Sequence, residues 1–394
     1  MTRLAVCLLA FIRFIVTTPG EDASTQTGIG WHCSEPGSYL ELSSDSDIQM
    51  RHAVRYLPDE TKWHLDGLDS LFRTDRYVCK LDLDGLKPGR TYRFRVCCDG
   101  TQSPTGIFST PPRKGGKWKF IACADFQHAF NQTAHRLVES LRSNAGNANL
   151  LVCSGDMVDY GASEAEWQWI LEHPSMKNIL FSASPGDHEY WGIRPEGERH
   201  YPMMAFPEGY NAIFNNPANG CTQLPNSSYW YIYRDVLFIH LDCGDSNTTR
   251  SPKYDAEVEW FKETVDSLQG KYKYLVVLGH KSMYGSYRED SGVVKYMQPL
   301  FATAFKEKKV DLVISGHDHM YSRTKSIDGT RYLDLGSSGN KARVPDERLR
   351  TDGLHEKVID FKTNPDCAGA IVTVSSKGLE VEVRNADGRI LDRF

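Results

Sequence analysis

From residue 117 onward, short apolar runs alternate with longer segments whose apolar residues recur every three or four positions. Continuous apolar runs are typical of strands buried on both faces, whereas the wider spacing is typical of amphipathic helices. The apolar runs lie at residues 120–124, 150–153, 179–183, 275–278 and 312–314. The helical segments lie at residues 131–144, 164–173, 254–269 and 293–309. Because strands and helices alternate, residues 117–394 are predicted to form an α/β domain.

Two stretches of this domain depart from the alternation. Residues 229–242 form two apolar segments around Arg234-Asp235, which predicts a β-hairpin. Residues 367–394 return to a strand-like pattern, with a turn at residues 385–388.

The N-terminal stretch, residues 28–112, has the pattern of an all-β domain. Short segments of strand-like residues, such as 76–81 and 91–96, are separated by turn signals, of which residues 86–90 are the clearest. Several strands at this spacing predict a small β-sandwich. The segment 110–116, which is rich in Pro and Gly, is predicted to link it to the α/β domain.

Composition and charge agree with a folded protein of two or three domains. The 394 residues are 40% hydrophobic and 25% charged, both close to the average for globular proteins. The formal net charge is −5, whereas a general nucleic-acid binder needs a basic surface. We therefore expect no nucleic-acid-binding surface.

The first 23 residues have the pattern of a cleaved signal peptide. Arg3 precedes a stretch from residue 4 to residue 16 that is apolar except for Arg13, and small or polar residues follow at 17–23. Elsewhere no run of 18 apolar residues exists, so no transmembrane span is predicted. Three glycosylation sequons, at Asn131, Asn226 and Asn247, favour a secreted protein or one in the lumen of the secretory and endolysosomal pathway.

The ten cysteines fit this compartment. Cys33, Cys79, Cys97 and Cys98 lie in the predicted sandwich and could form one or two disulfides. Cys123 and Cys153 lie inside apolar runs, where buried free thiols are expected. The sequence contains no CxxC pair, so neither a zinc ribbon nor a redox motif is indicated.

The candidate chemistry follows the predicted strands of the α/β domain. Each of the five apolar runs ends in a polar cluster, and the clusters contain Asp125 and Gln127, Asp156, Asp187-His188-Glu189, His280, and His317-Asp318-His319. Ligands of open α/β sheets bind at the carboxyl ends of the strands, so these side chains are expected at one edge. Carboxylate oxygens mixed with imidazole nitrogens suit Fe, Zn or Mn, and acceptors gathered this densely need cations between them. The sequence therefore predicts a site for two metal ions.

The ordered motifs resemble those of the calcineurin-like metallophosphoesterases, and more closely those of the purple acid phosphatases. The segment His280-Lys281-Ser282-Met283-Tyr284 is similar to that family's His-Arg-Pro-Met-Tyr, and residues 316–324 are similar to its Gly-His-x-His-x-Tyr-Glu-Arg. The resemblance implies a metallophosphoesterase domain with a β-sandwich core flanked by helices. It also implies that residues 28–112 form a fibronectin type III-like domain.

The resemblance also implies roles for individual residues. Asp156 would bridge the two metals. The first metal site would be completed by Asp125, His319 and the carbonyl oxygen of Gln127, and the second by Asp187, His280 and His317. His188 is the candidate for orienting the phosphate and protonating the leaving group, since histidine can exchange a proton at mildly acidic pH. Glu189 is expected to support the ligands without contacting the metals.

Three positions depart from the purple acid phosphatase pattern. Asp159 stands where the family has a tyrosinate ligand, with Tyr160 one residue late. Gln127 replaces a Gly of that family, and Asp187 replaces an Asn. The metal site is therefore expected to exist with a ligand set of its own.

Three functions compete at this point. The first is a secreted, metal-dependent acid phosphatase that hydrolyses phosphate monoesters of small molecules or proteins. The second is a phosphodiesterase acting on nucleotides or lipid head groups, with the long loop 190–228 as a possible selector of substrate. The third is a non-catalytic binding protein on a decayed metallophosphoesterase scaffold.

Overall fold

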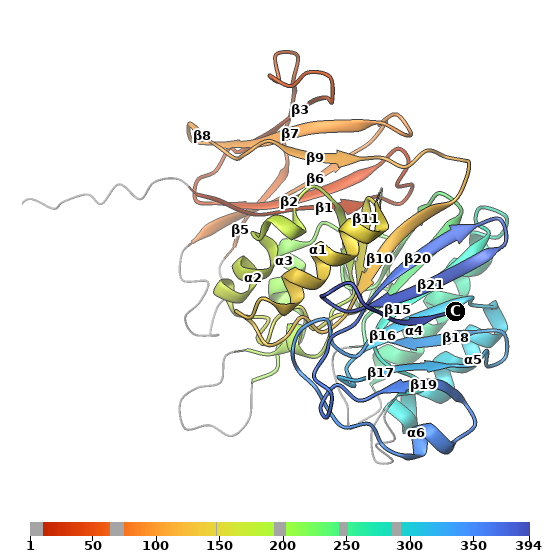
Figure 1. The fold of residues 1–394 in the computed structure, drawn as a ribbon. Helices are drawn as coiled ribbons and strands as arrows, with labels where there is room; N and C mark the ends of the chain where they lie inside the picture. The colour runs from red at the N-terminus through yellow and green to blue at the C-terminus, as the bar shows by residue number, and fades with distance from the viewer. Residues whose placement is uncertain (1–10, 64–74, 147, 193–201, 244–250, 286–292) are drawn as a thin grey trace, which may run out of the picture.

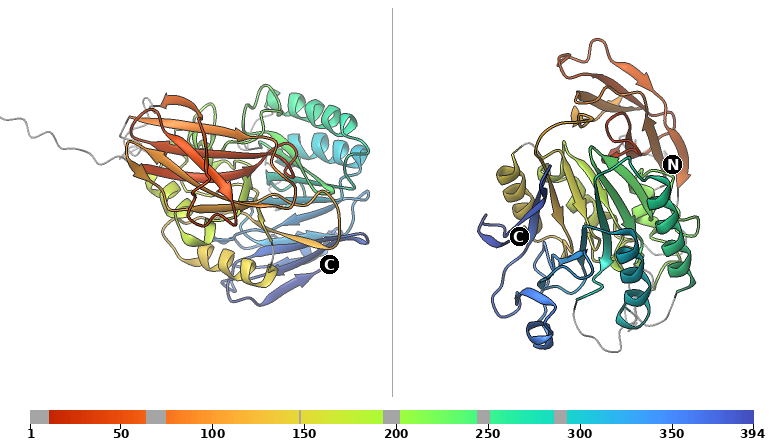
Figure 2. Two further views of the ribbon diagram at one scale, coloured as in Figure 1. Left: turned by 90° about the horizontal axis from the view of Figure 1, so that it is seen from above. Right: turned by 90° about the vertical axis from the view of Figure 1, so that its right-hand side faces the viewer.

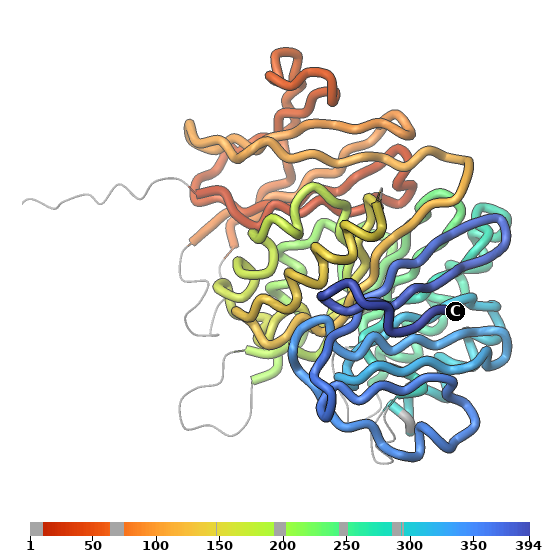
Figure 3. The backbone as a smooth tube through the Cα atoms, viewed as in Figure 1, coloured from red at the N-terminus to blue at the C-terminus, as the bar shows by residue number. Residues whose placement is uncertain are grey.

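The computed structural model describes residues 11–63, 75–146, 148–192, 202–243, 251–285 and 293–394. In Figure 1 the N-terminal strands form one body at the top, and the helices and remaining strands form a larger body below it. The chain passes from the first body to the second through residues 110–117, the segment predicted as a linker (Figure 3).

The N-terminal body is a sandwich of two antiparallel sheets. One sheet has the order β1-β2-β6-β5, and the other has the order β4-β3-β7-β8 with β9 also paired to β7. The strands are β1 (Ile12–Pro19), β2 (Thr27–Cys33), β3 (Tyr39–Ser44), β4 (Val54–Tyr56), β5 (Asp59–Trp63), β6 (Arg76–Leu83), β7 (Thr91–Cys98), β8 (Thr101–Gln102) and β9 (Gly106–Ser109). Side chains such as Trp31, Leu40 and Val96 fill the space between the sheets, which confirms the prediction of an all-β region.

The larger body contains two sheets packed face to face. The six-stranded sheet has the order β12-β11-β10-β20-β21-β22, and the seven-stranded sheet has the order β13-β14-β15-β16-β18-β17-β19. The first comprises β10 (Trp118–Cys123), β11 (Leu150–Cys153), β12 (Leu180–Ala183), β20 (Gly369–Ser375), β21 (Gly378–Arg384) and β22 (Ile390–Arg393). The second comprises β13 (Tyr229–Tyr233), β14 (Val236–Leu241), β15 (Tyr274–Lys281), β16 (Leu312–Gly316), β17 (Tyr321–Thr324), β18 (Arg331–Asp334) and β19 (His355–Ile359). Phe120 of one sheet and Phe238 of the other meet edge to face between them, with ring centroids 5.1 Å apart.

Helices cover the outer faces of both sheets (Figure 2). On the six-stranded sheet lie α1 (Thr133–Ala145) and α2 (Glu164–Leu171), and on the seven-stranded sheet lie α4 (Pro252–Ser267) and α5 (Gln298–Lys308). Short helical segments are η1 (Pro174–Met176), η2 (His188–Tyr190), α3 (Glu208–Ile213), η3 (Val293–Met297) and α6 (Arg348–Thr351). The apolar faces of α1 and α4 pack onto the sheets through residues such as Leu137 and Phe261, as their helical spacing predicts.

All five predicted strands and all four long helices are present, but the strands belong to two sheets. β10, β11 and β12 lie in one sheet and β15 and β16 in the other, so the single sheet edge expected from the sequence is wrong. The apolar runs are buried on both faces because each sheet is covered by helices outside and by the other sheet inside. The sequence pattern is the same for either arrangement.

Part of the predicted signal segment forms a strand in the structure. Strand β1 occupies residues 12–19 and pairs along β2 from Ile12↔Cys33 to Pro19↔Thr27. Phe14 and Ala23 are fully buried, and Thr17 Oγ1 donates a hydrogen bond of 3.0 Å to the carbonyl of Ile179 in the larger body. Cleavage after residue 23 would remove this strand. A short apolar run has the same composition in a signal segment and in a buried strand, so cleavage at this point stays a prediction.

The nine described cysteines are all free thiols, so the one or two disulfides expected among Cys33, Cys79, Cys97 and Cys98 are not formed. Cys123 and Cys153 are buried free thiols, as predicted. None of the helices in the described ranges is long and apolar enough to cross a membrane.

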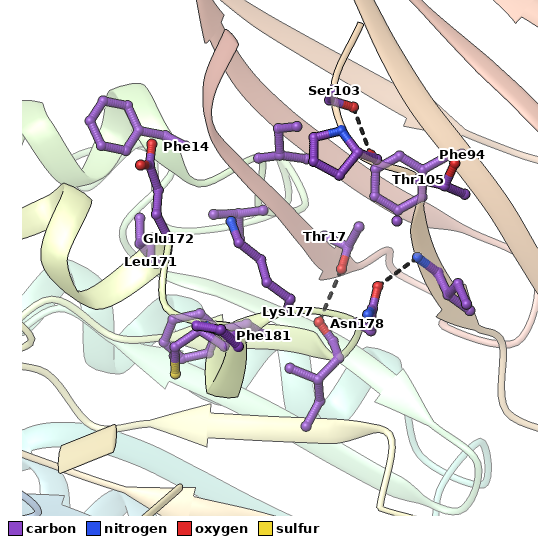
Figure 4. A pocket seen from close by; sticks show the side chains of 18 of the residues that line it. Phe14, Thr17, Phe94, Ser103, Thr105, Leu171, Glu172, Lys177, Asn178 and Phe181 are labelled. Atoms are coloured by element: carbon purple, nitrogen blue, oxygen red, sulfur yellow. Dashed lines mark hydrogen bonds between the residues drawn. The ribbon is translucent and has the colours of Figure 1, made fainter. Parts of the chain in front are cut away.

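Hydrogen bonds also join the two bodies around a cavity of about 590 Å³ (Figure 4). Its lining comes from β1, from the segment before β9 and from the connection between α2 and β12. Asn178 Oδ1 accepts a hydrogen bond of 2.8 Å from the backbone amide of Ile107, which lies in β9. The described part of the long loop 190–228 also packs against the N-terminal sandwich. Lys80 donates to the carbonyls of Asn211 and Phe214 at 2.7 and 3.0 Å.

Candidate metal centre

The carboxyl ends of β10, β11, β12, β15 and β16 converge where the two sheets of the larger body meet. Three buried aspartates, Asp125, Asp156 and Asp187, follow the strands of the six-stranded sheet. Three buried histidines complete the group: His280 lies within β15, and His317 and His319 follow β16. Six of the seven side chains that the sequence predicts as metal ligands therefore lie together, although they come from two sheets; the seventh, Gln127, is described below.

Four of these residues have a left-handed backbone conformation. Asp125, Asp156, His317 and His319 have φ values of 51°, 53°, 73° and 53°. Residues other than glycine rarely adopt positive φ, and such strain is concentrated at functional sites. The strained turns direct four side chains from the ends of three strands, β10, β11 and β16, into one volume.

Close backbone packing around the carboxylates explains two of the glycines in the motifs. A Cβ atom at Gly186 would collide with the carboxylate of Asp156, and one at Gly316 would collide with the carboxylate of Asp125. Both positions therefore require glycine for space.

One group of possible ligands is formed by Asp187, His280 and His317. Asp187 Oδ1 lies 3.1 Å from His280 Nε2 and 3.1 Å from His317 Nδ1. The other nitrogen of His280, Nδ1, lies 2.9 Å from the carbonyl oxygen of Ser154. Because a carbonyl only accepts, Nδ1 carries the proton and Nε2 is left to face the aspartates.

A second group is formed by Asp125, Asp156 and His319, each of which offers one ligand atom within 4.8 Å of the others. His319 Nε2 lies 3.2 Å from Asp125 Oδ1, yet neither ring nitrogen of this buried histidine makes a hydrogen bond. Buried polar atoms nearly always have a partner. A buried imidazole nitrogen that makes no hydrogen bond and lies beside a carboxylate is the arrangement expected of a metal ligand.

Asp156 connects the two groups. Its Oδ2 lies 3.1 Å from His280 Nε2, and its Oδ1 accepts a hydrogen bond of 3.0 Å from the backbone amide of His188. Burial opposes the ionised form of Asp156, but the imidazoles of His280 and His188 outweigh burial and hold its pKa below the usual range. Burial likewise opposes the charged form of His280, but Asp156 and Asp187 raise its pKa well above the usual value. The carboxylates thus draw positive charge into this volume, and a metal ion would supply the same charge.

Glu189 holds the loop that carries Asp156, as the sequence predicts. Its Oε2 accepts hydrogen bonds from the amides of Asp156 at 2.9 Å and Gly186 at 2.6 Å, and its Oε1 accepts one from Met157 at 2.7 Å. Burial, followed by the charge of Asp156, raises the pKa of Glu189 to about 8.

We expect Glu189→Gln to weaken metal binding by about tenfold, within the range known for groups that orient ligands. Both carboxylate oxygens of Glu189 accept hydrogen bonds from backbone amides. In glutamine one of these oxygens becomes an NH₂ group, which donates and would face another donor. Metal retained after dialysis against a graded series of chelator concentrations measures the effect. The matched control is Glu139→Gln on the exposed face of α1. Equal retention by the two variants would contradict this role of Glu189.

Lys341 is the residue of this centre that sequence reasoning missed. Its Nζ donates to Gln127 Oε1 at 2.7 Å and lies 3.1 Å from His188 Nε2. His188 Nδ1 lies 2.8 Å from the carbonyl oxygen of Asp159, so Nδ1 carries a proton and Nε2 accepts from Lys341. The ring of Trp191 packs against that of His188, with centroids 3.7 Å apart.

The carbonyl oxygen of Gln127, predicted as a metal ligand, is therefore held by Lys341, and its Nε2 donates to the carbonyl of Val158 at 3.3 Å. No motif in the sequence analysis includes Lys341. Its partners are distant in sequence: Gln127 lies 214 positions away and His188 lies 153 positions away.

Asp159, at the position of the family's tyrosinate, is turned toward a neighbouring loop. Its Oδ2 accepts a hydrogen bond of 2.7 Å from the amide of Ala129, and its Oδ1 lies 3.3 Å from His128 Nδ1. The amide of Tyr160 donates to Glu166 at 3.0 Å. Asp159 therefore acts on loop structure and does not replace the missing ligand.

Two of the three predicted glycosylation residues lie in described parts of the chain. The side-chain amide of Asn226 donates to the carbonyl of Phe214 at 3.1 Å, so a glycan there would have to replace a hydrogen bond of the fold. Asn131 is partly exposed, two residues before the start of α1, and Asn247 lies outside the described residues.

Comparison with known proteins agrees with this geometry. A family model described as calcineurin-like phosphoesterase matches residues 119–321, which include Asp125 through His319. The phosphoenolpyruvate phosphatase of Allium cepa is 28% identical over 286 residues, covering 70% of this chain and 56% of that protein. The Fe(3+)-Zn(2+) purple acid phosphatase 12 of Arabidopsis thaliana is 21% identical over 270 residues, covering 66% of this chain and 55% of that protein. The chain thus spans little more than half the length of these curated relatives.

Among solved structures, a purple acid phosphatase from seeds of yellow lupin (Lupinus luteus) superposes with a TM-score of 0.74 at 14% identity. The match covers 97% of this chain and 74% of the lupin protein, so the likeness of fold includes the N-terminal sandwich. Since the family model matches more than half of its residues, this chain belongs to the calcineurin-like phosphoesterase family, as a purple acid phosphatase-like member.

Proposed function

We propose that this protein is a metal-dependent acid phosphatase that hydrolyses phosphate monoesters at a dinuclear centre. The observation that carries the proposal is the pair of buried ligand groups, Asp125–Asp156–His319 and Asp187–His280–His317. Within the first group, His319 Nε2 lies beside Asp125 and makes no hydrogen bond among the described residues. The names of the onion and Arabidopsis relatives, a phosphoenolpyruvate phosphatase and an Fe(3+)-Zn(2+) purple acid phosphatase, support a monoesterase with Fe, Zn or Mn.

Each residue of the centre has a role in this proposal. Asp156 would bridge the two metals, Asp125 and His319 would hold the first, and Asp187, His280 and His317 would hold the second. When bound, two such cations clamp a phosphate, lower the pKa of a water and neutralise the developing charge. Gln127 would complete the first site only if its side-chain carbonyl oxygen gave up the hydrogen bond from Lys341 and bound the metal instead.

His188 and Lys341 are the candidates for handling the substrate. The ring of His188 is fixed by Trp191 and by the carbonyl of Asp159, which leaves Nε2 directed at Lys341 and 3.9 Å from Asp156 Oδ2. An ammonium group beside this nitrogen can bind a phosphate oxygen. His188 Nε2, which accepts from Lys341 in the structure, can deliver a proton to the leaving oxygen after it has itself been protonated. We assign His188 the role of general acid and Lys341 that of a phosphate-binding residue.

The proposal is tested by turnover of p-nitrophenyl phosphate and of bis(p-nitrophenyl) phosphate, before and after chelation. We expect faster turnover of the monoester, loss of activity on chelation and recovery when Fe, Zn or Mn is returned. Faster turnover of the diester would favour a phosphodiesterase. Intact metal content without turnover of either ester would identify a binding protein on an inactive scaffold.

Lys341→Met is expected to lower kcat/KM for the monoester by roughly tenfold, because a charge-assisted hydrogen bond contributes about 1.5–3 kcal/mol. Metal content should not change, since Lys341 contributes no ligand. The matched control is Lys362→Met, a lysine in an exposed turn after β19. Unchanged kcat/KM in Lys341→Met would remove this residue from the substrate site.

The metal-loaded protein is expected to lack the purple colour of the resembled family. That colour arises from charge transfer between a tyrosinate and iron, and Asp159 stands at the tyrosinate position with its carboxylate bound to Ala129 and His128. A visible absorption spectrum of the iron-loaded protein measures this. A strong visible band that is lost in Tyr160→Phe would contradict it.

The proposal also includes location and the nature of the N-terminal body. The sequons favour a secreted protein or one in the lumen of the secretory and endolysosomal pathway, with phosphorylated small molecules or proteins as substrates. The two antiparallel sheets of the N-terminal sandwich support the fibronectin type III-like assignment.

A further inference from the structure

Three buried thiols lie close together inside the N-terminal sandwich, with a carboxylate from the edge strand β5 beside them. Cys33 on β2 and Cys79 on β6 are fully buried, and their Sγ atoms lie 3.7 Å apart. Glu60 on β5 places Oε2 3.8 Å from Cys79 Sγ. Cys98, on β7 of the opposite sheet, shares an acceptor with Cys33, because both thiols donate to the carbonyl oxygen of Glu35, at 3.4 and 3.2 Å. We call these four side chains the thiol cluster.

The strand register opposes a disulfide between the two nearest thiols. On the paired strands β2 and β6, Trp31 stands opposite Cys79 and Cys33 stands opposite Tyr77, so the two cysteines are diagonal neighbours. Diagonal positions on antiparallel strands are about 7–8 Å apart, beyond the usual Cα···Cα range of about 4.4–6.8 Å for a disulfide. Closing this bond would require the backbone to move.

The sulfur spacing instead fits a tetrahedral metal site. Zinc binds thiolates at about 2.3 Å, so two sulfurs at neighbouring corners of a tetrahedron are about 3.8 Å apart. The observed separation between Cys33 and Cys79 is 3.7 Å. Possible ligand atoms of Cys33, Cys79 and Glu60 all lie within 4.8 Å of one another.

Neighbouring groups hold the ligands in the form that a metal needs. Trp31 Nε1 donates to Ser38 Oγ at 3.0 Å, which leaves the Ser38 hydroxyl free to donate to Cys79 Sγ at 3.2 Å. The backbone amide of Gly37 binds both oxygens of Glu60, at 3.2 and 2.9 Å. Donors to a thiolate and to a ligating carboxylate are the partners that orient metal ligands in known sites.

We propose that Cys33, Cys79, Cys98 and Glu60 bind one Zn²⁺ ion that links the two sheets of the N-terminal sandwich. The ligands come from β2, β5 and β6 of one sheet and from β7 of the other, so the ion joins both sheets at one end. Glu60, on the edge strand, gives the ion access from solvent. The site is separate from the dinuclear centre, whose ligands contain no sulfur.

The test uses Co²⁺ as a spectroscopic probe of the full chain, reduced and freed of metal. Thiolate ligands give intense charge-transfer absorption with Co²⁺, which carboxylate and imidazole ligands do not give, so the band reports on the thiol cluster alone. We expect the band to saturate at one Co²⁺ per cluster and to disappear when Zn²⁺ is added. It should be lost in Cys33→Ser and retained in Cys97→Ser, a buried thiol on β7 beside Cys98.

Glu60→Gln provides a variant that keeps the thiols and the buried core. It is expected to weaken Zn²⁺ binding at the cluster at least about tenfold, measured by competition with a chromophoric chelator. The proposal is overturned if the wild-type chain gives no charge-transfer band with Co²⁺, or if the band survives Cys33→Ser. It is equally overturned if mass spectrometry of alkylated protein, as isolated, finds two of the cluster cysteines joined in a disulfide.

Discussion

Asp156→Ala is expected to lower phosphatase turnover on the order of a thousandfold and to release most of the bound metal. The carboxylate of Asp156 lies beside side-chain ligand atoms of both groups. It shares a group with Asp125 and His319, and its Oδ2 lies 3.1 Å from His280 Nε2. Removing it would leave His280 and its partners without their central negative charge. Steady-state kinetics and metal analysis on the same preparation measure both effects.

The control for this substitution is Asp387→Ala, which removes an exposed carboxylate that is 72% accessible and pairs only with Arg136 among the described residues. It should keep full activity. Near-ultraviolet circular dichroism of the metal-free proteins separates loss of ligand from loss of fold. A folded Asp156→Ala protein that keeps most of its metal and activity would show that the dinuclear assignment is wrong.

Asp187→Asn restores the residue of the resembled family, yet we expect it to weaken metal binding and turnover roughly a hundredfold. Asp187 Oδ1 lies 3.1 Å from both His280 Nε2 and His317 Nδ1. Burial opposes its charge, but His317 and His280 outweigh burial and hold its pKa well below the usual range. In the resembled family, the corresponding negative charge is on the tyrosinate of the first site. On the proposed ligand assignment, Asp187 supplies that charge in the second site.

The same chemical change at an exposed position provides the control. Asp328→Asn alters a turn residue that pairs with Lys306, at a left-handed position with φ of 52° that asparagine adopts readily. Metal content and turnover should be unchanged there. If Asp187→Asn keeps its metal and turns over as fast as the parent, the charge of Asp187 does not compensate for the missing tyrosinate.

The predicted metal ligands could be grouped from the sequence because each lies at or just after the carboxyl end of a buried strand. Burial on both faces produces a continuous apolar run, and the polar cluster that ends the run marks the carboxyl end of the strand. Asp125, Asp156 and His280 could be assigned to one place on this basis alone. The pattern does not say which strands share a sheet, so the division between two sheets could not be predicted.

Residues outside these clusters carried no such signal. Lys341 reaches Gln127 and His188 through the folding of a loop that follows β18, and a lysine in a polar segment has the same pattern whether it faces a site or solvent. Trp191 packs on His188 only because η2 turns the chain back at residue 190. Cys33 and Cys98 lie on different sheets, so their proximity depends on how the two sheets pack. The alternation of residues along a strand shows which side chains share a face but not which residues of the other sheet lie opposite.

Anomalous scattering from crystals of the metal-loaded protein, collected at the absorption edges of iron, zinc and manganese, tests the dinuclear centre most directly. The account predicts two peaks roughly 3.5–4 Å apart, one on each side of the Asp156 carboxylate. One peak should be bounded by Asp125 and His319, and the other by Asp187, His280 and His317. A single peak, or two peaks that do not share Asp156, would contradict it.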